Sequence, residues 1–255
     1  MKKLLVLIIA AMTLIGMMLT CCGGDKKAAE KILKVGTEPS FAPFEFQKPG
    51  SKELTGFDID LIKAVCKQAG YKAEIVSMGF DGLIPAIMSG NLDIAISGMT
   101  ITEERKKKVS FSDSYYTSGL IIMVNKDNNN IKSLKDLEGK KIACQIGTTG
   151  EAKARSVKGA KVVDFNNNVE AAMELKNRGV DAVINDAPVA EYYLAQGGKE
   201  TAKLVGEVME AEEYGFAFKK DSKLVGEMNK ALAELKKNGE YDKIYKTWFG
   251  EKKKK

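Results

Sequence analysis

The chain has 255 residues, a formal charge of +6 from 40 basic and 34 acidic side chains, and no histidine. Without histidine the usual general base at neutral pH, the Ser-His and Cys-His nucleophile pairs and imidazole-ligated metals are excluded. The charged fraction of 29% and the hydrophobic fraction of 44% are those of a folded protein, long enough for one large domain or two smaller ones. The sequence contains no basic stripe interleaved with aromatic residues, which is the pattern that indicates nucleic-acid binding.

Residues 1–21 have the pattern of a lipoprotein signal peptide. Two lysines precede an apolar stretch from Leu4 to Leu19, which is short for a membrane span. The stretch leads into two adjacent cysteines and resembles a bacterial lipobox, in which a cysteine is acylated before cleavage. Cys22 fits that pattern better than Cys21, so residues 22–30 become a lipidated tether and the mature charge is 6 − 2 = +4. A secretory peptide with two incidental cysteines is the alternative.

Short apolar runs alternate with helical patterns along the rest of the chain. The runs predict strands at 32–35, 73–76, 92–96, 119–124, 141–145, 161–165 and 181–184. Apolar residues spaced three and four apart predict helices at 59–69, 151–157, 169–178 and 222–238. This alternation is typical of parallel sheets that are flanked by helices.

Two segments in different halves of the chain repeat one pattern, in which a helix ends, turns and enters a strand. Small or polar residues follow each strand, Ser97-Gly98-Met99-Thr100 in one case and Asn185-Asp186-Ala187-Pro188 in the other. Ligands of open α/β sheets bind at the carboxyl ends of strands, so two such ends can face each other across a cleft. Ordinary strand-to-helix turns are the alternative.

Several motifs together resemble the family 3 extracellular solute-binding proteins, the amino-acid receptors of ABC importers. The resemblance extends from Val35 to Phe249, and similarity to glutamine- and arginine-binding members implies a two-lobed, periplasmic-binding-protein-like α/β fold with mostly parallel sheets. The lobes would close on one amino acid about two hinge strands. The motifs that carry the resemblance are Gly56-Phe57-Asp58-Ile59-Asp60-Leu61, Phe41-Ala42-Pro43-Phe44-Glu45-Phe46, Gly98-Met99-Thr100-Ile101-Thr102 with Glu104-Arg105, Phe111-Ser112-Asp113, Gly147-Thr148-Thr149-Gly150, Asn185-Asp186 and Tyr245-Lys246-Thr247-Trp248-Phe249-Gly250.

The same resemblance implies where the lobes begin and end. Cys66 and Cys144 then fall in apolar stretches of different lobes, so we expect buried free thiols rather than a disulfide. The implied bounds are 31–114 with 215–250 for lobe 1, 119–209 for lobe 2, 115–118 and 210–214 for the hinge strands, and 251–255 for a basic tail.

Arg105 and Asp186 are the candidates for the two poles of an amino acid. A guanidinium binds a carboxylate bidentately and stays ionised, and the resemblance gives Arg105 this role. The alternative is a place in the solvated basic run that ends at Lys108. Asp186 suits the α-ammonium, as the resemblance also implies, or else it caps the helix that begins at Pro188. Asn185 is a neighbouring candidate for a polar contact.

Small and hydroxylic residues are candidates for the remaining polar contacts. Ser97, Gly98 and Thr100 follow one strand, where backbone groups and the threonine hydroxyl can bond the ammonium and the carboxylate. Thr148 and Thr149 precede a predicted helix, whose exposed N–H groups can meet carboxylate oxygens. A capped turn without a ligand is the alternative for this pair.

Four further residues are expected around the ligand side chain. Phe41 and Phe80 can enclose its methylenes and attract a cationic tip, with packing in the core as the alternative. Glu38 can pair with a guanidinium or ammonium, accept from a carboxamide, and repel an anionic side chain. Some glutamine binders carry lysine at the position of Gln145, so a cationic ligand is easier to accommodate here. We therefore expect arginine or lysine ahead of glutamine, with histidine behind.

The resemblance implies a monomeric, lipid-anchored receptor in the periplasm or on the outer face of the cell membrane. Its partners are a polar L-amino acid and the permease subunits of an ABC importer, with no metal, cofactor or nucleic acid and no catalysis. One alternative is an exported enzyme similar to the cyclohexadienyl dehydratases, with Glu38 or Asp186 as the acid. Another is a sensor whose closed form contacts a receptor. Retention of both Arg105 and Asp186 favours binding of a zwitterion.

Overall fold

The structure is a computed structural model that describes residues 31–48, 50–209 and 211–251. The predictions for the signal peptide, the tether, acylated Cys22, hinge residue Glu210 and tail residues 252–255 lie outside the described residues. Everything below concerns the compact unit that begins at Lys31.

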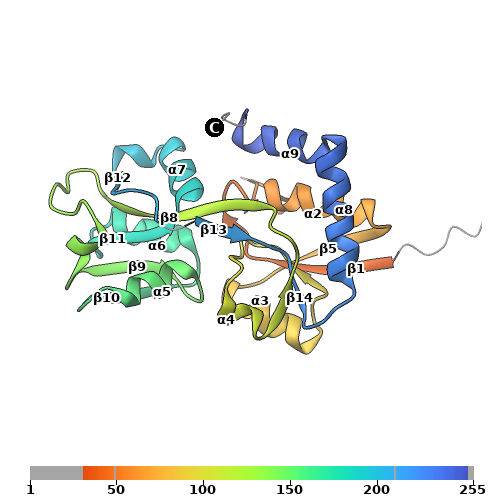
Figure 1. Ribbon diagram of the computed structural model, residues 1–255. Coiled ribbons are helices and arrows are strands. Elements are labelled where there is room, and N and C mark those ends of the chain that lie inside the picture. The colour runs from red at the N-terminus through yellow and green to blue at the C-terminus, as the bar shows by residue number, and fades with distance from the viewer. Residues whose placement is uncertain (1–30, 49, 210, 252–255) are drawn as a thin grey trace, which may run out of the picture. The chain divides into compact units, whose positions relative to one another are not determined.

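The first sheet has the strand order β5-β1-β6-β14-β7 (Figure 1). Its parallel half consists of β1 (Lys31–Thr37), β5 (Tyr71–Ser77) and β6 (Ile94–Ala95), and its antiparallel half adds β14 (Ala217–Lys219) and β7 (Val109–Phe111). A small separate sheet of three strands follows β1 in the chain, with bounds β2 (Ser40–Phe41), β3 (Glu45–Gln47) and β4 (Leu54–Thr55).

Helices cover both faces of the first sheet, because successive side chains of a strand point to opposite faces and the strands place apolar residues on both. One cluster joins Leu33 and Val35 to α2 (Phe57–Gln68), α8 (Leu224–Asn238) and α9 (Glu240–Phe249). The other joins Ala95 and Val109 to α3 (Phe80–Ser89), and the single-turn helix α4 (Glu103–Lys106) leads into β7. Helix α8 ends where the sequence predicts, at Gly239 in the left-handed conformation with φ 81°.

The second sheet has the order β10-β9-β11-β8-β12 (Figure 1). Strands β9 (Lys141–Gln145), β10 (Lys161–Phe165) and β11 (Ala182–Asp186) are parallel, whereas β8 (Tyr116–Asn125) and β12 (Ala202–Val205) are antiparallel to their neighbours. The remaining elements of this region are α5 (Thr149–Ser156), α6 (Asn168–Lys176), α7 (Ala187–Ala195) and the 3-10 turns η1 (Leu134–Leu137) and η2 (Gly198–Glu200).

Strand alternation assigns the helices of the second sheet to its two faces. Ile122 and Val124 of β8 pack with α5, whereas Met123 between them packs with α6. The same alternation holds on β11, where Ala182 and Ile184 face α5 and Val183 faces α6. This phase decides which residues at the end of β11 can reach a common site.

Both sheets are mixed, so the prediction of parallel strands holds for the half of each sheet in which strands alternate with helices. The antiparallel strands are those on the segments that pass between the sheets. The chain enters the second sheet along β8, and β13 (Ala211–Tyr214) pairs antiparallel with residues 116–119 of β8, as Figure 1 shows. The two connecting strands are thus hydrogen-bonded to each other.

Two smaller predictions can be compared directly with the structure. Cys66 and Cys144 are free and buried in different clusters, which confirms their expected state. The strand predicted over 92–96 is regular only at Ile94–Ala95, because Leu92 packs against α3 instead. Within the described residues, no helix combines the length and apolar character that a membrane crossing needs.

Candidate functional site

One cavity collects all but one of the predicted ligand-binding residues. It lies where β1, β6, β9 and β11 end, since Glu38, Ser97 and Gly98 follow the first two strands and Gln145 and Asp186 are the last residues of the others. Both sheets therefore present their carboxyl ends to it. The lining residues are Glu38, Phe41, Phe80, Ser97, Gly98, Thr100, Arg105, Gln145, Thr148, Thr149 and Asp186.

Arg105 belongs to the cavity wall rather than to the solvated basic run. Its Nη1 donates to the Thr100 carbonyl at 2.7 Å and its Nη2 to the Gly147 carbonyl at 3.0 Å, so the guanidinium contacts segments that follow both sheets. The guanidinium carbon also lies 5.3 Å from the centroid of the Phe80 ring. Burial lowers the pKa of Arg105 to about 10, which leaves it a cation at neutral pH with three N–H donors still unassigned.

Asp186 is oriented by the connecting strands and does not cap α7. Its Oδ1 accepts hydrogen bonds from the Tyr214 hydroxyl at 2.5 Å and from Ser118 Oγ at 3.1 Å, and no cap bond to α7 forms. Burial, followed by repulsion from Glu212, raises the pKa of Asp186 to about 7. The helix-cap alternative is therefore not realised, and Oδ2 is left for a cationic group.

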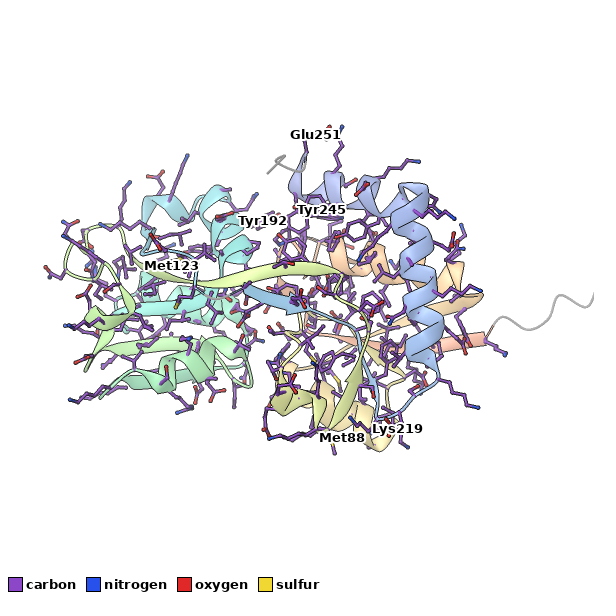
Figure 2. The ribbon with its side chains drawn as sticks, viewed as in Figure 1. Met88, Met123, Tyr192, Lys219, Tyr245 and Glu251 are labelled. Carbon is purple, nitrogen blue, oxygen red and sulfur yellow. The ribbon has the colours of Figure 1, made fainter. Side chains whose placement is uncertain are left out.

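Asn185 is the one predicted site residue that the structure does not bring to the cavity. It shares the face of β11 that Val183 occupies, because side chains one residue apart on a strand point to opposite sides. That face lines a second, apolar cavity with Met123 and Tyr192, both labelled in Figure 2. The structure therefore places Asn185 and Asp186 in different cavities.

Glu38 and Gln145 meet across the cavity. Gln145 Nε2 donates to Glu38 Oε2 at 3.2 Å, and Ser40 Oγ donates to the same oxygen at 2.6 Å. Gln145 is held in turn by the Asn166 carbonyl at 3.0 Å and by Asn168 Nδ2 at 2.6 Å. Burial raises the pKa of Glu38 despite these hydrogen bonds, which is the sign of a carboxylate without a matching cation.

The two aromatic candidates line the cavity and also belong to the cores on either side of the first sheet. Phe41 lies on β2 and Phe80 is the first residue of α3, and each has less than a tenth of its surface exposed. Gly98 lies directly against the Phe41 ring, since a Cβ there would lie 2.5 Å from Phe41 Cε1, and its φ is +50°. Only glycine lets the Phe41 ring approach this backbone.

Ser97 and Gly98 are held from behind by a buried pair of acids. Ser97 Oγ donates to Glu45 Oε1 at 2.8 Å, and the Gly98 N–H donates to Asp58 Oδ2 at 2.9 Å. The Gly98 N–H is thus already used by Asp58. The other oxygens, Glu45 Oε2 and Asp58 Oδ1, are buried with no further described partner. One shared proton can join them.

The two threonines after β9 have different tasks. Thr148 is the N-cap of α5: its Oγ1 accepts from the Glu151 N–H at 3.1 Å and donates to the Gln145 carbonyl at 2.7 Å. Thr149 Oγ1 instead donates to Glu212 Oε2 at 2.9 Å, and Thr100 Oγ1 donates to the same oxygen at 3.0 Å. Sequence reasoning missed Glu212, because nothing local separates it from the neighbouring Glu213.

No group of histidine, cysteine, aspartate and glutamate residues in the described part of the chain has the geometry of a metal site. The cavity instead has one guanidinium, two carboxyl groups and two aromatic rings among its lining residues. These groups can bind a small polar molecule that carries both an anionic and a cationic centre.

Comparison with known proteins gives this arrangement a family. Residues 33–251 match the bacterial extracellular solute-binding proteins, family 3. The chain belongs to this family. Like other members, this solute-binding protein acts outside the cytoplasm, and the resemblance found in its sequence motifs is confirmed.

Relatives of this family 3 protein include receptors named for arginine. The arginine-binding extracellular protein ArtP of Bacillus subtilis is 42% identical over 264 residues, which cover 99% of this chain and all of that protein. An ancestral arginine-binding protein has been solved with arginine and with glutamine, and both structures are 50% identical to this chain. The alignments cover 87% of this chain and 99% of the ancestral one, with TM-scores of 0.84 and 0.81.

Proposed function

We propose that this protein is an extracytoplasmic receptor that binds L-arginine or L-lysine in preference to L-glutamine, and delivers it to an ABC importer. Residues of the two sheets close around the amino acid and then open at the permease. The relatives named for arginine support an amino acid as the ligand, and the charges around the cavity support L-arginine or L-lysine over L-glutamine.

The backbone of the amino acid is recognised by two opposite charges. Its α-carboxylate accepts hydrogen bonds from the free N–H groups of Arg105. It also accepts from the N–H groups at the start of α5, on the opposite side of the cavity. Its α-ammonium donates to Asp186, which Tyr214 and Ser118 already hold by one oxygen. Each buried charge thereby gains the partner that makes its burial tolerable.

The observation that decides the side chain is Glu38. Glu38 is 8% exposed, and the two described hydrogen-bond partners of its carboxyl group, Ser40 and Gln145, are neutral and share Oε2. The zwitterion already matches Arg105 and Asp186, so Glu38 is the remaining carboxylate in the lining. A guanidinium or ammonium at the tip of the side chain supplies its missing cation. A carboxamide offers only a neutral donor.

Ligand binding favours closure because the ligand touches both sides at once. The α-carboxylate reaches Arg105 on the first side and α5 on the second, and the side chain lies between Glu38 and Gln145. Contacts that exist only in the closed state shift the equilibrium toward it. The paired strands β8 and β13 are the segments about which such a motion takes place.

Calorimetric titration of the protein with L-arginine, L-lysine, L-glutamine and L-histidine tests this proposal. We expect L-arginine or L-lysine to bind at least about tenfold more tightly than L-glutamine. The cationic side chains make a contact with Glu38 in which both partners are charged, whereas the carboxamide of L-glutamine offers a neutral donor. Equal affinity for all four, or preference for L-glutamine, would refute the role of Glu38.

We also propose that the receptor is monomeric and is anchored by acyl chains on Cys22. The anchor rests on the lipobox pattern of residues 19–22. Intact-mass measurement of protein extracted from membranes should show a diacylated or triacylated N-terminus at Cys22, and Cys22→Ser should release the protein from the membrane. Light scattering of the released form should give the mass of one chain. A role as a sensor would be favoured instead if deleting the permease left the cellular response to the ligand unchanged.

We propose further that the ligand leaves chemically unchanged. The carboxyl group that would serve best as an acid, Asp186, is the partner of the α-ammonium in this account, and its raised pKa follows from burial and from Glu212. Prolonged incubation with L-arginine should return it quantitatively. Any turnover detected by chromatography would favour the enzyme alternative.

A further inference from the structure

Glu212 joins the two sides of the cavity through a single oxygen. It lies on the connecting strand β13, paired with Ser118 of β8. Its Oε2 accepts hydrogen bonds from Thr100 Oγ1 at 3.0 Å and from Thr149 Oγ1 at 2.9 Å. Thr100 follows the first sheet, whereas Thr149 begins α5 in the second region.

The direction of these two hydrogen bonds determines what the threonines can offer. A hydroxyl group has one hydrogen, so a threonine that donates to Glu212 can only accept from anything else. The threonine hydroxyls therefore present lone pairs to the cavity that they both line. Lone pairs suit an ammonium group and repel a carboxylate.

The backbone N–H groups of the same threonines remain suited to an anion. The bridge between Thr100 and Tyr214 uses the N–H groups of Ile101 and Gly215, so it does not use the N–H of Thr100. Thr149 is the first residue of α5, where an N–H has no partner within the helix. Each threonine thus has a donor for a carboxylate and an acceptor for an ammonium.

Glu212 also contributes charge on the side of Asp186. Repulsion from Glu212 is the largest effect after burial on the pKa of Asp186, while attraction to Glu212 opposes the effect of burial on Arg105. The charges that act on Glu212 itself include Arg105 and Lys153. Two carboxylates close to one position favour a cation there over a neutral group.

We propose that Glu212 is a positioning residue which fixes the Thr100 and Thr149 hydroxyls as acceptors and thereby restricts the cavity to ligands that carry an α-ammonium group. This inference rests on the proposed function, because it assigns the polarity of the same site. It concerns a residue that need not touch the ligand. Without Glu212, the hydroxyls are free to turn and to donate to a neutral or anionic group instead.

The test compares two ligands that differ only in the α-amino group, L-arginine and 5-guanidinopentanoate. Their dissociation constants are measured by calorimetry for the wild-type protein, Glu212→Ala and Glu213→Ala. The last variant is the matched control, since Glu213 is the exposed neighbour on the same strand. The melting temperature of each ligand-free variant is recorded in parallel.

We expect Glu212→Ala to weaken L-arginine binding about 10- to 100-fold, because the α-ammonium loses charge-assisted hydrogen bonds. The same change should weaken 5-guanidinopentanoate binding less than about threefold, because this ligand has no α-ammonium. The preference for the α-amino group then narrows at least about threefold. Glu213→Ala should leave both constants within about threefold of wild type. Adding Thr100→Val to Glu212→Ala should cost less than Thr100→Val costs alone, because both changes remove the same acceptor.

Equal weakening of both ligands by Glu212→Ala, or no change in L-arginine binding, would overturn the inference while leaving the proposed function in place. If that variant is too unstable to titrate, Glu212→Met provides the same test with a larger side chain. A methionine has no carboxylate or amide oxygen to accept from the hydroxyls, so they are free to turn, and the preference should still narrow at least about threefold. Failure of the wild-type protein to bind L-arginine would instead remove the proposed function and this inference with it.

Discussion

The most informative perturbation is pH, because Asp186 titrates near neutrality. Burial and the repulsion of Glu212 raise its pKa from 3.8 to about 7. The α-ammonium of the ligand binds the ionised carboxylate, so the binding-competent fraction rises with pH. Affinity for L-arginine should therefore increase from pH 5 to pH 8, and binding below pH 7 should release a proton.

The size of this effect follows from the fraction of ionised Asp186. With a pKa of about 7, that fraction is about 0.9 at pH 8 and about 0.01 at pH 5, and apparent affinity scales with the competent fraction. L-Arginine should thus bind about 90-fold more weakly at pH 5 than at pH 8. Glu38, whose pKa burial also raises, adds to the slope for a cationic side chain but less for L-glutamine.

The assay is calorimetric titration at unit steps of pH, in two buffers of different ionisation enthalpy so that proton release is measured directly. Asp186→Asn is the control, because it keeps the shape but removes the titrating group. Its binding should be weak and should keep only the smaller pH dependence that Glu38 contributes. A flat profile for the wild-type protein, or a slope in Asp186→Asn as steep as that of the wild type, would refute the assignment of the ammonium to Asp186.

Three further predictions concern single residues. Glu38→Gln should weaken L-arginine about 10- to 100-fold and L-glutamine less than about threefold in the same titrations, whereas equal losses would remove the reason for preferring a cationic ligand. Glu45→Gln should remove one component of the pH dependence of unfolding in urea. Burial beside Asp58 raises the pKa of Glu45 well above 4.5, so the folded state keeps a proton that the unfolded state loses, and the contribution of Glu45 to wild-type stability falls as pH rises above 4.5. An unchanged slope would argue against a shared proton. Gly98→Ala should lower both the melting temperature and ligand affinity, because its Cβ would lie 2.5 Å from the Phe41 ring, and unchanged values would contradict that packing.

Much of the site could be predicted because its chemistry is local. Asp186 and Glu38 are charged residues at strand ends, and strand ends of parallel sheets meet at one edge. Arg105 lies farther along the chain, in α4, and was found through the family motif that contains it. Apolar periodicity located those strands, so their ends were located as well. The lining of the cavity by these residues follows from topology, without any detail of packing.

The features that the sequence did not reveal depend on contacts between distant segments. The position of Asn185 relative to the cavity depends on the phase of alternation along β11, which only the packing of α5 and α6 reveals. The partner of the Gly98 N–H could not be predicted because Asp58 is 40 positions away in the sequence. Glu212 was overlooked because its partners, Thr100 and Thr149, are 112 and 63 positions away.

The central claim is that one amino acid is held by its carboxylate at Arg105 and by its ammonium at Asp186. A crystal structure of the protein grown with L-arginine tests it most directly. The account predicts the α-carboxylate within hydrogen-bond distance of the Arg105 guanidinium, the α-ammonium on Asp186 and the ligand guanidinium at Glu38. A ligand bound in the reverse orientation, or one that leaves either Arg105 or Asp186 without contact, would contradict it.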